Sequence, residues 1–331
     1  MIVEQSKRSG YIDFIKGIAI LLVLVGHAIQ YCYGAEYLIQ REFLNNSLFR
    51  FIYTFHMPLF MAVSGYLLQR SLLHRTEGEV ALRRLRQLVI PILSFGVMAF
   101  AIKWAVRPIY NLMECVKELF HTCIGNLWFL WALLYNQLLL LFIRRMGDKI
   151  WMYVIAGIMI YFIPESNYIP AHYTSLYPFL VLGYMTGKFS LERVYKGNRR
   201  VSLTIVMLVL YVSIRYINPT LHVEPWVHTI IVQCCRLCAL GWILPLLHTL
   251  YTTYAPKNSV EFIVNTGRDS LGIYYFQTLI FILISRTSHL LPSLGVWGAI
   301  IGFCVVTAEC LLLAKWSKQY RITRLLVLGC K

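Results

Sequence analysis

The stretch GYIDFIKGIAILLVLVGHAIQYC at positions 10–32 decides the fold of this chain. Between Lys16 and His27 it runs through GIAILLVLVG without a single charge. About 20 mostly apolar residues are enough for a helix to cross the hydrocarbon core of a bilayer. The stretch therefore predicts a first transmembrane helix. We expect it to be retained, because Asp13 and Lys16 stand at its start and no small-residue cleavage site follows it.

The rest of the chain repeats this pattern. Its 331 residues are 58% hydrophobic and only 14% charged, with a mean hydropathy of +0.62. A soluble domain usually has about a quarter of its residues charged. The pattern predicts an all-α polytopic membrane protein, a single domain over residues 1–331 with about ten transmembrane helices in one bundle. The expected spans are 12–33, 47–69, 87–106, 125–143, 150–163, 174–189, 201–217, 227–251, 269–285 and 293–314.

The distribution of basic residues supports this map. If the N-terminus is cytoplasmic, the cytoplasmic segments hold 22 lysines and arginines and the outer segments hold 6. The outer six are Arg41, Lys103, Arg107, Lys117, Arg215 and Arg286. Cytoplasmic loops of membrane proteins carry such an excess. We therefore expect both termini in the cytoplasm of a cell membrane, most simply a bacterial inner membrane. The same excess accounts for most of the net charge of +16, so no nucleic-acid partner is expected.

The first span contains ionisable residues that lipid does not tolerate. Lys16 and His27 are eleven residues apart, which on a helix brings them to within about 20° of each other and about 16 Å apart along the axis. Asp13 falls within about 60° of both. Intramembrane ionisable groups usually face a bundle interior or a wet cavity. Asp13 and Lys16 can also be explained by snorkelling to the membrane surface, and His27 by simple packing.

The second span adds a histidine beside a proline, in FHMPLFMAVSGYLL at 55–68. Pro58 removes a backbone hydrogen bond and is expected to kink the helix. His56 would lie at the same depth as His27 if the two helices are antiparallel neighbours. It could instead be a structural histidine bonded to the loosened backbone. Gly65 is expected to permit close helix packing, as are Gly183 and Gly187.

The chemistry that fits is acid–base catalysis by histidine. A neutral imidazole can take a proton from a hydroxyl as that hydroxyl attacks an acyl carbon. The sequence contains no G-x-S-x-G, H-E-x-x-H or glycine-rich phosphate loop. The nine cysteines show no metal-binding spacing, so no metal site is expected. This pattern favours direct transfer over a covalent serine intermediate.

In these segments the chain resembles the membrane acyltransferase-3 family. YIDFIKGIAILLVLVGHA at 11–28 and FHMPLFMAVSGYLL at 55–68 are similar to the first two family signatures. NLWFLWALL at 126–134, LYPFLVLGYMTGK at 176–188 and TGRDSLGIYYFQ at 266–277 resemble later ones. The resemblance covers most of the chain in order. It implies a ten-helix transferase that moves an acyl group, commonly acetyl, from acyl-CoA to a hydroxyl of a cell-envelope or lipid-linked carbohydrate.

The resemblance also suggests residue roles. It implies a catalytic role for His27 and a supporting role for Lys16, where the family more often has arginine. Gln277 stands where the family segment often ends in histidine, and it is given no proton-transfer role. Substrate contacts are expected from a second set of residues, namely Asp13, His56, Trp128, Phe129 and Arg236.

Several of these residues have simpler alternatives. Arg83, Arg84 and Arg86 are candidates for the CoA phosphates, but such a basic run also fits a topology signal or lipid headgroup contact. Trp128 and Phe129 are also typical of interfacial or packing aromatics.

Arg236 lies well inside a late span, as does Glu309, and the two could form a structural ion pair. A glycan or lipid transporter is the alternative function, although no internal repeat is visible. The enzyme is expected to hold no permanent cofactor, with acetyl-CoA or another acyl-CoA as donor.

Overall fold

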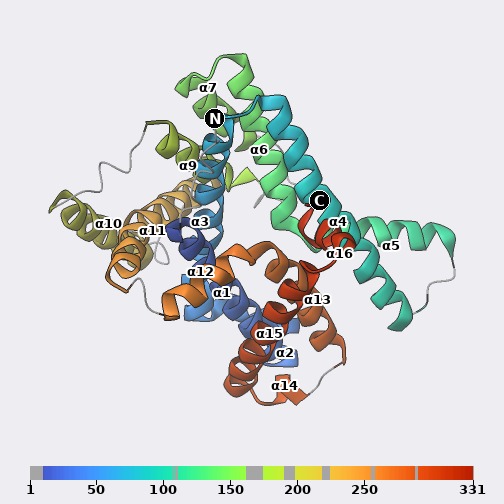
Figure 1. The fold of residues 1–331 in the computed structure, drawn as a ribbon. Helices are drawn as coiled ribbons and strands as arrows, with labels where there is room; N and C mark the ends of the chain where they lie inside the picture. The colour runs from blue at the N-terminus through green and yellow to red at the C-terminus, as the bar shows by residue number, and fades with distance from the viewer. Residues whose placement is uncertain are drawn as a thin grey trace.

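The computed structural model describes residues 10–106, 108, 111–161, 174–189, 198–217, 224–254, 258–287 and 290–330. Within these ranges the chain consists of helices joined by short connections and contains no strand (Figure 1). The elements are α1 (Gly10–Cys32), α2 (Ala35–Ile39), the 3-10 helix η1 (Glu42–Asn45), α3 (Ser47–Leu72), α4 (Glu77–Val106), α5 (Leu112–Gly125), α6 (Trp128–Met146), α7 (Ile150–Tyr161), α9 (Tyr177–Phe189), α10 (Asn198–Ile217), α11 (Pro225–Tyr254), α12 (Asn258–Arg268), α13 (Ser270–Thr287), α14 (Leu290–Ser293), α15 (Val296–Ser317) and α16 (Arg321–Leu328).

The prediction of an all-α membrane protein is confirmed. Each of the ten expected spans overlaps a described helix, although residues 162 and 163 of the fifth lie outside the described residues. Six described helices are long and apolar enough to cross a membrane: α1, α3, α4, α6, α11 and α15. Three more, α7, α10 and α13, are apolar but shorter, and α9 has 13 residues. The number of ten spans therefore stays a prediction.

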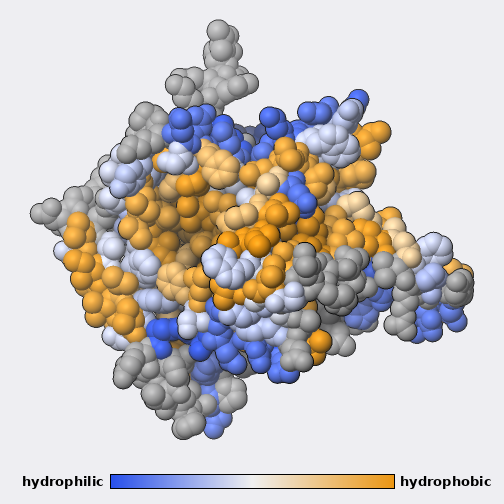
Figure 2. Space-filling view, turned by 90° about the horizontal axis from the view of Figure 1, so that it is seen from below, coloured by the Kyte–Doolittle hydropathy of each residue, from blue (hydrophilic) through white to orange (hydrophobic). Residues whose placement is uncertain are grey.

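The outer surface matches a lipid environment. Figure 2 shows a broad hydrophobic field, with hydrophilic side chains gathered toward its upper and lower margins. Large aliphatic side chains such as Val154, Ile158, Val201 and Val209 are more than half exposed on α7 and α10. A water-soluble monomer rarely exposes apolar patches of this extent. These faces are suited to contact with acyl chains.

Glycines set the closest helix contacts, as expected for small residues in membrane bundles. On α3, Gly65 lies against the backbone carbonyl of Leu180 on α9, so that any Cβ there would clash. Gly183 of α9 lies in the same way against Ala62 of α3. The predicted packing role of Gly65 and Gly183 is thus confirmed. The helix α3 continues through Pro58, so the proline does not end it.

The helix α12 was not expected from the sequence; it packs across the start of α1. Gly17 on α1 lies against the carbonyl of Ile263, and Gly267 on α12 lies against the carbonyl of Asp13. The two helices can approach this closely because neither glycine has a side chain at the crossing point. The contact brings the last residue of α12, Arg268, to the start of α1.

The connection before the third span is also more helical than expected. We predicted a span beginning at residue 87, but α4 begins at Glu77. Thr76 and Glu79 explain the early start, because each side chain accepts a hydrogen bond from the other's backbone N–H. Arg83 and Arg84 therefore lie on a helix rather than in a loop.

Basic residues gather at one end of the bundle. Lys16 near the start of α1, Arg70 near the end of α3 and Arg84 near the start of α4 line one cavity. We name this the basic end. The opposite end, where α1 ends at Cys32 and α3 begins at Ser47, is named the far end.

Candidate active site

A large cavity opens at the basic end between α1, α3, α4, α6 and α13. We name it the basic cavity, and its volume is about 780 Å³. The basic residues on its wall are Lys16, Arg70, Arg75, Arg83, Arg84, Arg268 and Lys318. Asp13 is the one carboxylate among the described residues of the lining. Deeper in, the wall becomes apolar, with Val23, Met57 and Phe60. The cavity therefore combines a strongly cationic entrance with an apolar interior.

Asp13 organises the entrance from α1. Its carboxylate is only 2% exposed and lies 3.5 Å from Lys16 Nζ and 3.5 Å from Arg268 Nε. A buried carboxylate needs such partners. Because Lys16 and Arg268 share the single negative charge of Asp13, this group of three side chains keeps a net positive charge. Asp13 and Lys16 share a cavity-facing surface, as expected from the sequence. Arg268 was not expected there, and the crossing of α1 and α12 brings it to Asp13.

Arg84 supplies a cation that protein groups only partly satisfy. One of its terminal nitrogens donates to Gln87 Oε1 at 3.2 Å. Its Nε is buried and has no hydrogen-bond partner among the described residues. A buried, unsatisfied guanidinium nitrogen is costly unless a ligand or water completes it. Arg83 lines the same cavity, whereas Arg86 is exposed on α4 and lies outside the described lining.

His27 is held by a side chain on another helix. Its Nδ1 lies 2.7 Å from Gln277 Oε1 on α13. The Gln277 amide nitrogen donates to Thr278 Oγ1 at 2.9 Å, and that hydroxyl in turn donates to the Tyr274 carbonyl at 2.9 Å. This chain directs the amide oxygen, an acceptor, toward His27. The Nδ1 of His27 must then carry the proton, which leaves Nε2 with a free lone pair.

Gln277 is the residue whose importance the sequence analysis missed. It is fully buried, and it fixes both the orientation and the tautomer of His27. The sequence pointed to Gln277 only through its position at the end of TGRDSLGIYYFQ, where the family often has histidine. Tyr31 and Phe281 complete the surroundings, with each ring edge-on to the imidazole at 5.8 Å.

His56 is held by its own helix instead. Its Nδ1 donates to the Ile52 carbonyl at 2.7 Å, which agrees with the alternative of a histidine bonded to the backbone. Its Nε2 is buried and without a partner among the described residues. The Tyr53 ring packs against His56 at 4.5 Å and touches α1 at Gly26, next to His27.

The remaining predicted residues are spread over other places. Phe129 lines the basic cavity, whereas Trp128 packs edge-on against Phe129 and is not part of the described lining. Arg236 lies outside this cavity and donates to Ser175 Oγ at 3.4 Å. Glu309 is exposed on α15, and no ion pair with Arg236 is present among the described contacts. The structure thus brings together Asp13, Lys16, Arg83, Arg84 and Phe129 around the basic cavity.

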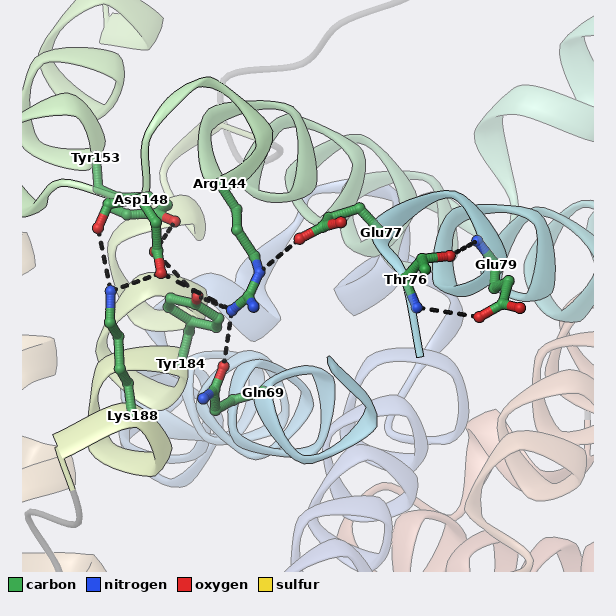
Figure 3. Close-up of polar contacts among 9 residues, drawn as sticks. All are labelled: Gln69, Thr76, Glu77, Glu79, Arg144, Asp148, Tyr153, Tyr184 and Lys188. Carbon is green, nitrogen blue, oxygen red and sulfur yellow. Dashed lines mark hydrogen bonds and ion pairs between the residues drawn. The ribbon is translucent and has the colours of Figure 1, made fainter. Parts of the chain in front are cut away.

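A second polar cluster at the basic end has a different character (Figure 3). Arg144 on α6 binds Glu77 on α4 at 2.9 Å, and Lys188 on α9 binds Asp148 at 2.7 Å. Arg144 also donates to Tyr184 Oη at 2.7 Å. We name these residues the polar cluster. Their charges are balanced, and they join α4, α6 and α9 into one block.

Comparisons with known proteins identify the family of the chain. The model of an acyltransferase domain matches residues 9–315, and the chain belongs to the acyltransferase-3 family. This membership confirms the resemblance that the sequence indicated. Nodulation protein NolL of Mesorhizobium japonicum is 34% identical over 177 residues, covering 52% of this chain and 46% of that protein. Nodulation protein NolL of Sinorhizobium fredii is 34% identical over 179 residues, covering 52% and 47%. The chain spans about half the length of these curated relatives. No solved structure matches it.

Proposed function

We propose that this chain transfers an acyl group, in the first instance acetyl, from acyl-CoA to a hydroxyl of a cell-surface or lipid-linked carbohydrate. The observation that carries the proposal is the hydrogen bond between His27 Nδ1 and Gln277 Oε1. It prepares His27 as a neutral general base. Val23, which lines the basic cavity, lies one helical turn before His27 on α1, or about 6 Å along the helix. Family membership in an acyltransferase group favours this function over a transporter.

The basic cavity is the proposed donor site. CoA carries several phosphates on one end and a slender pantetheine arm on the other. The cationic entrance around Arg83 and Arg84 suits the phosphates, because guanidinium groups bind phosphate oxygens in pairs. The apolar interior at Met57 and Phe60 suits the arm. The thioester would then reach toward His27.

The proposed reaction is a direct acyl transfer. His27 Nε2 takes the proton of the acceptor hydroxyl while the hydroxyl oxygen attacks the thioester carbonyl carbon. The new C–O bond forms, the C–S bond breaks, and the leaving thiolate takes the proton from the imidazolium. Gln277 accepts from Nδ1 throughout and so keeps the ring in one orientation. His56 Nε2 is available to a hydroxyl of the acceptor.

The proposal also includes an orientation. We place the basic end in the cytoplasm, both termini on that side, and ten spans in a single membrane unit of a bacterial inner membrane. The excess of lysine and arginine supports this choice. His27 and His56 then lie in the outer half of the bilayer. Labelling of single cysteines introduced at positions 27 and 56, from each side of the membrane, tests this depth.

The decisive experiment compares glycan acetylation in a deletion strain that carries wild-type or variant protein. His27→Ala is expected to lower acetylation by about 100-fold or more, since general bases contribute roughly 10²–10⁴-fold. His121→Ala is the matched control, because His121 is exposed on α5. Normal acetylation by His27→Ala, with the protein present in the membrane, would show that His27 is not the base.

Gln277 provides a companion test in the same strain. Gln277→Ala should lower the turnover rate by about tenfold while the KM for acetyl-CoA is unchanged, because the loss affects only the orientation of the base. Gln277→His, the residue common in the family, should recover most of the rate. An increase in KM without a loss of rate would place Gln277 at the donor site instead.

A further inference from the structure

The segment that follows α15 forms part of the wall of the basic cavity. We name residues 318–330 the α16 segment; it contains α16 and lies beyond residues 9–315, which the acyltransferase model matches. Three of its side chains line the cavity: Lys318, Leu328 and Cys330. The helix α16 lies beside α4 and also contacts α13 and α15 (Figure 1). A segment distant in sequence from α1 and α4 therefore shapes the proposed donor site.

Two contacts hold the α16 segment on α4. Ser94 Oγ on α4 donates a hydrogen bond to the Leu326 carbonyl at 2.6 Å. At the end of α16, Gly329 lies directly on the backbone of α4, where a Cβ would clash with the carbonyl of Arg86 and with Cα of Gln87. Gly329 also has a φ of +61°, a left-handed conformation that favours glycine. The close contact therefore depends on glycine at this position.

Gln87 connects the α16 segment to Arg84. Its Nε2 donates to Cys330 Sγ at 3.8 Å, and its Oε1 accepts from a terminal nitrogen of Arg84 at 3.2 Å. All three side chains line the basic cavity. An amide has one donor end and one acceptor end, so a partner for its nitrogen directs its oxygen toward Arg84. The α16 segment thereby orients the guanidinium group of Arg84.

The cations of this wall differ in their protein partners. Lys318 forms an ion pair with Asp269, which attaches the start of the α16 segment to the start of α13. Arg84 forms no ion pair with a described carboxylate, and its Nε is buried without a partner among the described residues. A guanidinium group in this state can bind the oxygens of an anion in the cavity. Lys318 therefore anchors the segment, whereas Arg84 is oriented for a ligand.

We propose that Gln87, Gly329 and Cys330 are positioning residues, which hold Arg84 in the orientation that binds a phosphate of the acyl-CoA donor. This inference rests on the proposed function and adds to it the residues that prepare the phosphate site. Gly329 lets the α16 segment reach α4, Cys330 orients Gln87, and Gln87 orients Arg84. The α16 segment then determines affinity for the phosphate end of the donor and leaves the chemistry at His27 unchanged.

The first test measures the KM for acetyl-CoA and the turnover rate at saturation for the full-length protein in membrane vesicles. Gln87→Ala should raise KM about tenfold, because Arg84 loses the contact that orients it. Cys330→Ala should raise KM about threefold, since sulfur is a weak acceptor. Cys330→Ser keeps an acceptor for Gln87 and should restore the wild-type KM. Turnover at saturation should not change, and Cys304→Ala, on the exposed surface of α15, is the matched control.

A shorter donor separates positioning from a general loss of structure. S-acetylpantetheine carries the same thioester without the phosphates, so its kcat/KM should be equal in wild type and in each variant. Gly329→Ala should raise the KM for acetyl-CoA about tenfold or more, because the added Cβ lifts the α16 segment from α4. Gly295→Ala is its control: Gly295 also has a positive φ, of +56°, but lies near Tyr33 and outside the described lining. An equal loss with both donors would overturn the positioning role.

Labelling of Cys330 tests the same site without acyl transfer. N-ethylmaleimide should modify Cys330, and the modified peptide is quantified by mass spectrometry. Adenosine 3′,5′-bisphosphate, the phosphate end of the donor, should slow this labelling about tenfold when present at about ten times its dissociation constant. Adenosine, which has no phosphate, should give no protection. His27→Ala should be protected as wild type is, because His27 takes no part in phosphate binding.

The outcomes distinguish this inference from the proposed function. Protection of wild type together with an unchanged KM in Gln87→Ala and Gly329→Ala would overturn the positioning role and leave the donor site intact. Absence of protection by both the bisphosphate and acetyl-CoA would overturn the donor site itself, and the inference with it. Raised KM values with acetyl-CoA alone, restored by Cys330→Ser, would support the inference whether or not His27 is the base.

Discussion

The basic cavity and the polar cluster both lie at the basic end, but their charges are arranged differently. In the polar cluster Arg144 and Lys188 meet Glu77 and Asp148, and every one of these charged groups has an opposite partner within 4 Å (Figure 3). In the basic cavity the described lining has seven lysines and arginines and a single carboxylate, Asp13. Charge balance is typical of a structural network, whereas a surplus calls for an anionic ligand.

The contrast teaches how to distinguish structural from functional charge in this membrane protein. The charges of the polar cluster are paired across helices, whereas several cations of the basic cavity, such as Arg70, Arg75 and Arg83, are exposed and available to an anionic ligand. The polar cluster should therefore determine stability, and the basic cavity should determine substrate binding. Each of the following variants tests one side of that division.

The largest effect is expected from the basic cavity. Arg83→Gln combined with Arg84→Gln should raise the KM for acetyl-CoA about 100-fold, because each lost charge-assisted contact is equivalent to about tenfold. Turnover at saturation and thermal stability should change little. Initial-rate kinetics in membrane vesicles measure both constants.

Arg86→Gln is the control for this variant, since Arg86 lies on the same helix, is exposed and is not part of the described lining. It removes the same charge from the same end of the bundle. An equal rise in KM with Arg86→Gln would mean that a general positive field, rather than the cavity, attracts the donor.

How far the sequence could lead is clear from individual residues. Helix phase placed Asp13 and Lys16 on one cavity-facing surface, because a helix has a fixed period that the sequence reveals directly. The same reasoning could not find Arg268. It reaches Asp13 only through the Gly17–Gly267 crossing of α1 and α12, a tertiary contact between segments far apart in the chain.

Gln277 and Arg236 show that side-chain partners on other helices cannot be read from the sequence. The sequence indicated the segment of Gln277 but not its partner, since a hydrogen bond to His27 depends on how α13 packs beside α1. Arg236 was predicted to contact substrate, and it lies outside the basic cavity, where it donates to Ser175. Depth along a helix can be counted from the sequence, but the side of the bundle that a span faces is set by its neighbours.

A smaller effect, on stability alone, is expected from the polar cluster. Arg144→Ala should lower the free energy of unfolding by about 2 kcal/mol, since it leaves Glu77 without its partner in a partly buried position. The KM for acetyl-CoA should stay the same. Thermal unfolding in detergent measures the change. Arg145→Ala, on the exposed neighbour, should be neutral, and a raised KM in Arg144→Ala would break the proposed division of roles.

The smallest effect concerns the pH dependence of the same cluster. Burial would raise the pKa of Asp148, but hydrogen bonds from Lys188, Tyr153 and Tyr184 lower that pKa below its ordinary value of 3.8. A carboxylate whose folded pKa is lowered contributes stability above its unfolded pKa, and this contribution is lost as the pH falls through the folded value. Asp148→Asn should therefore reduce stability near pH 7, and its difference from wild type should shrink only as the pH falls below 3.8 toward the lowered folded pKa. Thermal unfolding across that range measures the difference, with Glu114→Gln on the exposed start of α5 as control. A difference from wild type that persists unchanged into acid would show that packing around Asp148, and not its charge, stabilises the block of α4, α6 and α9.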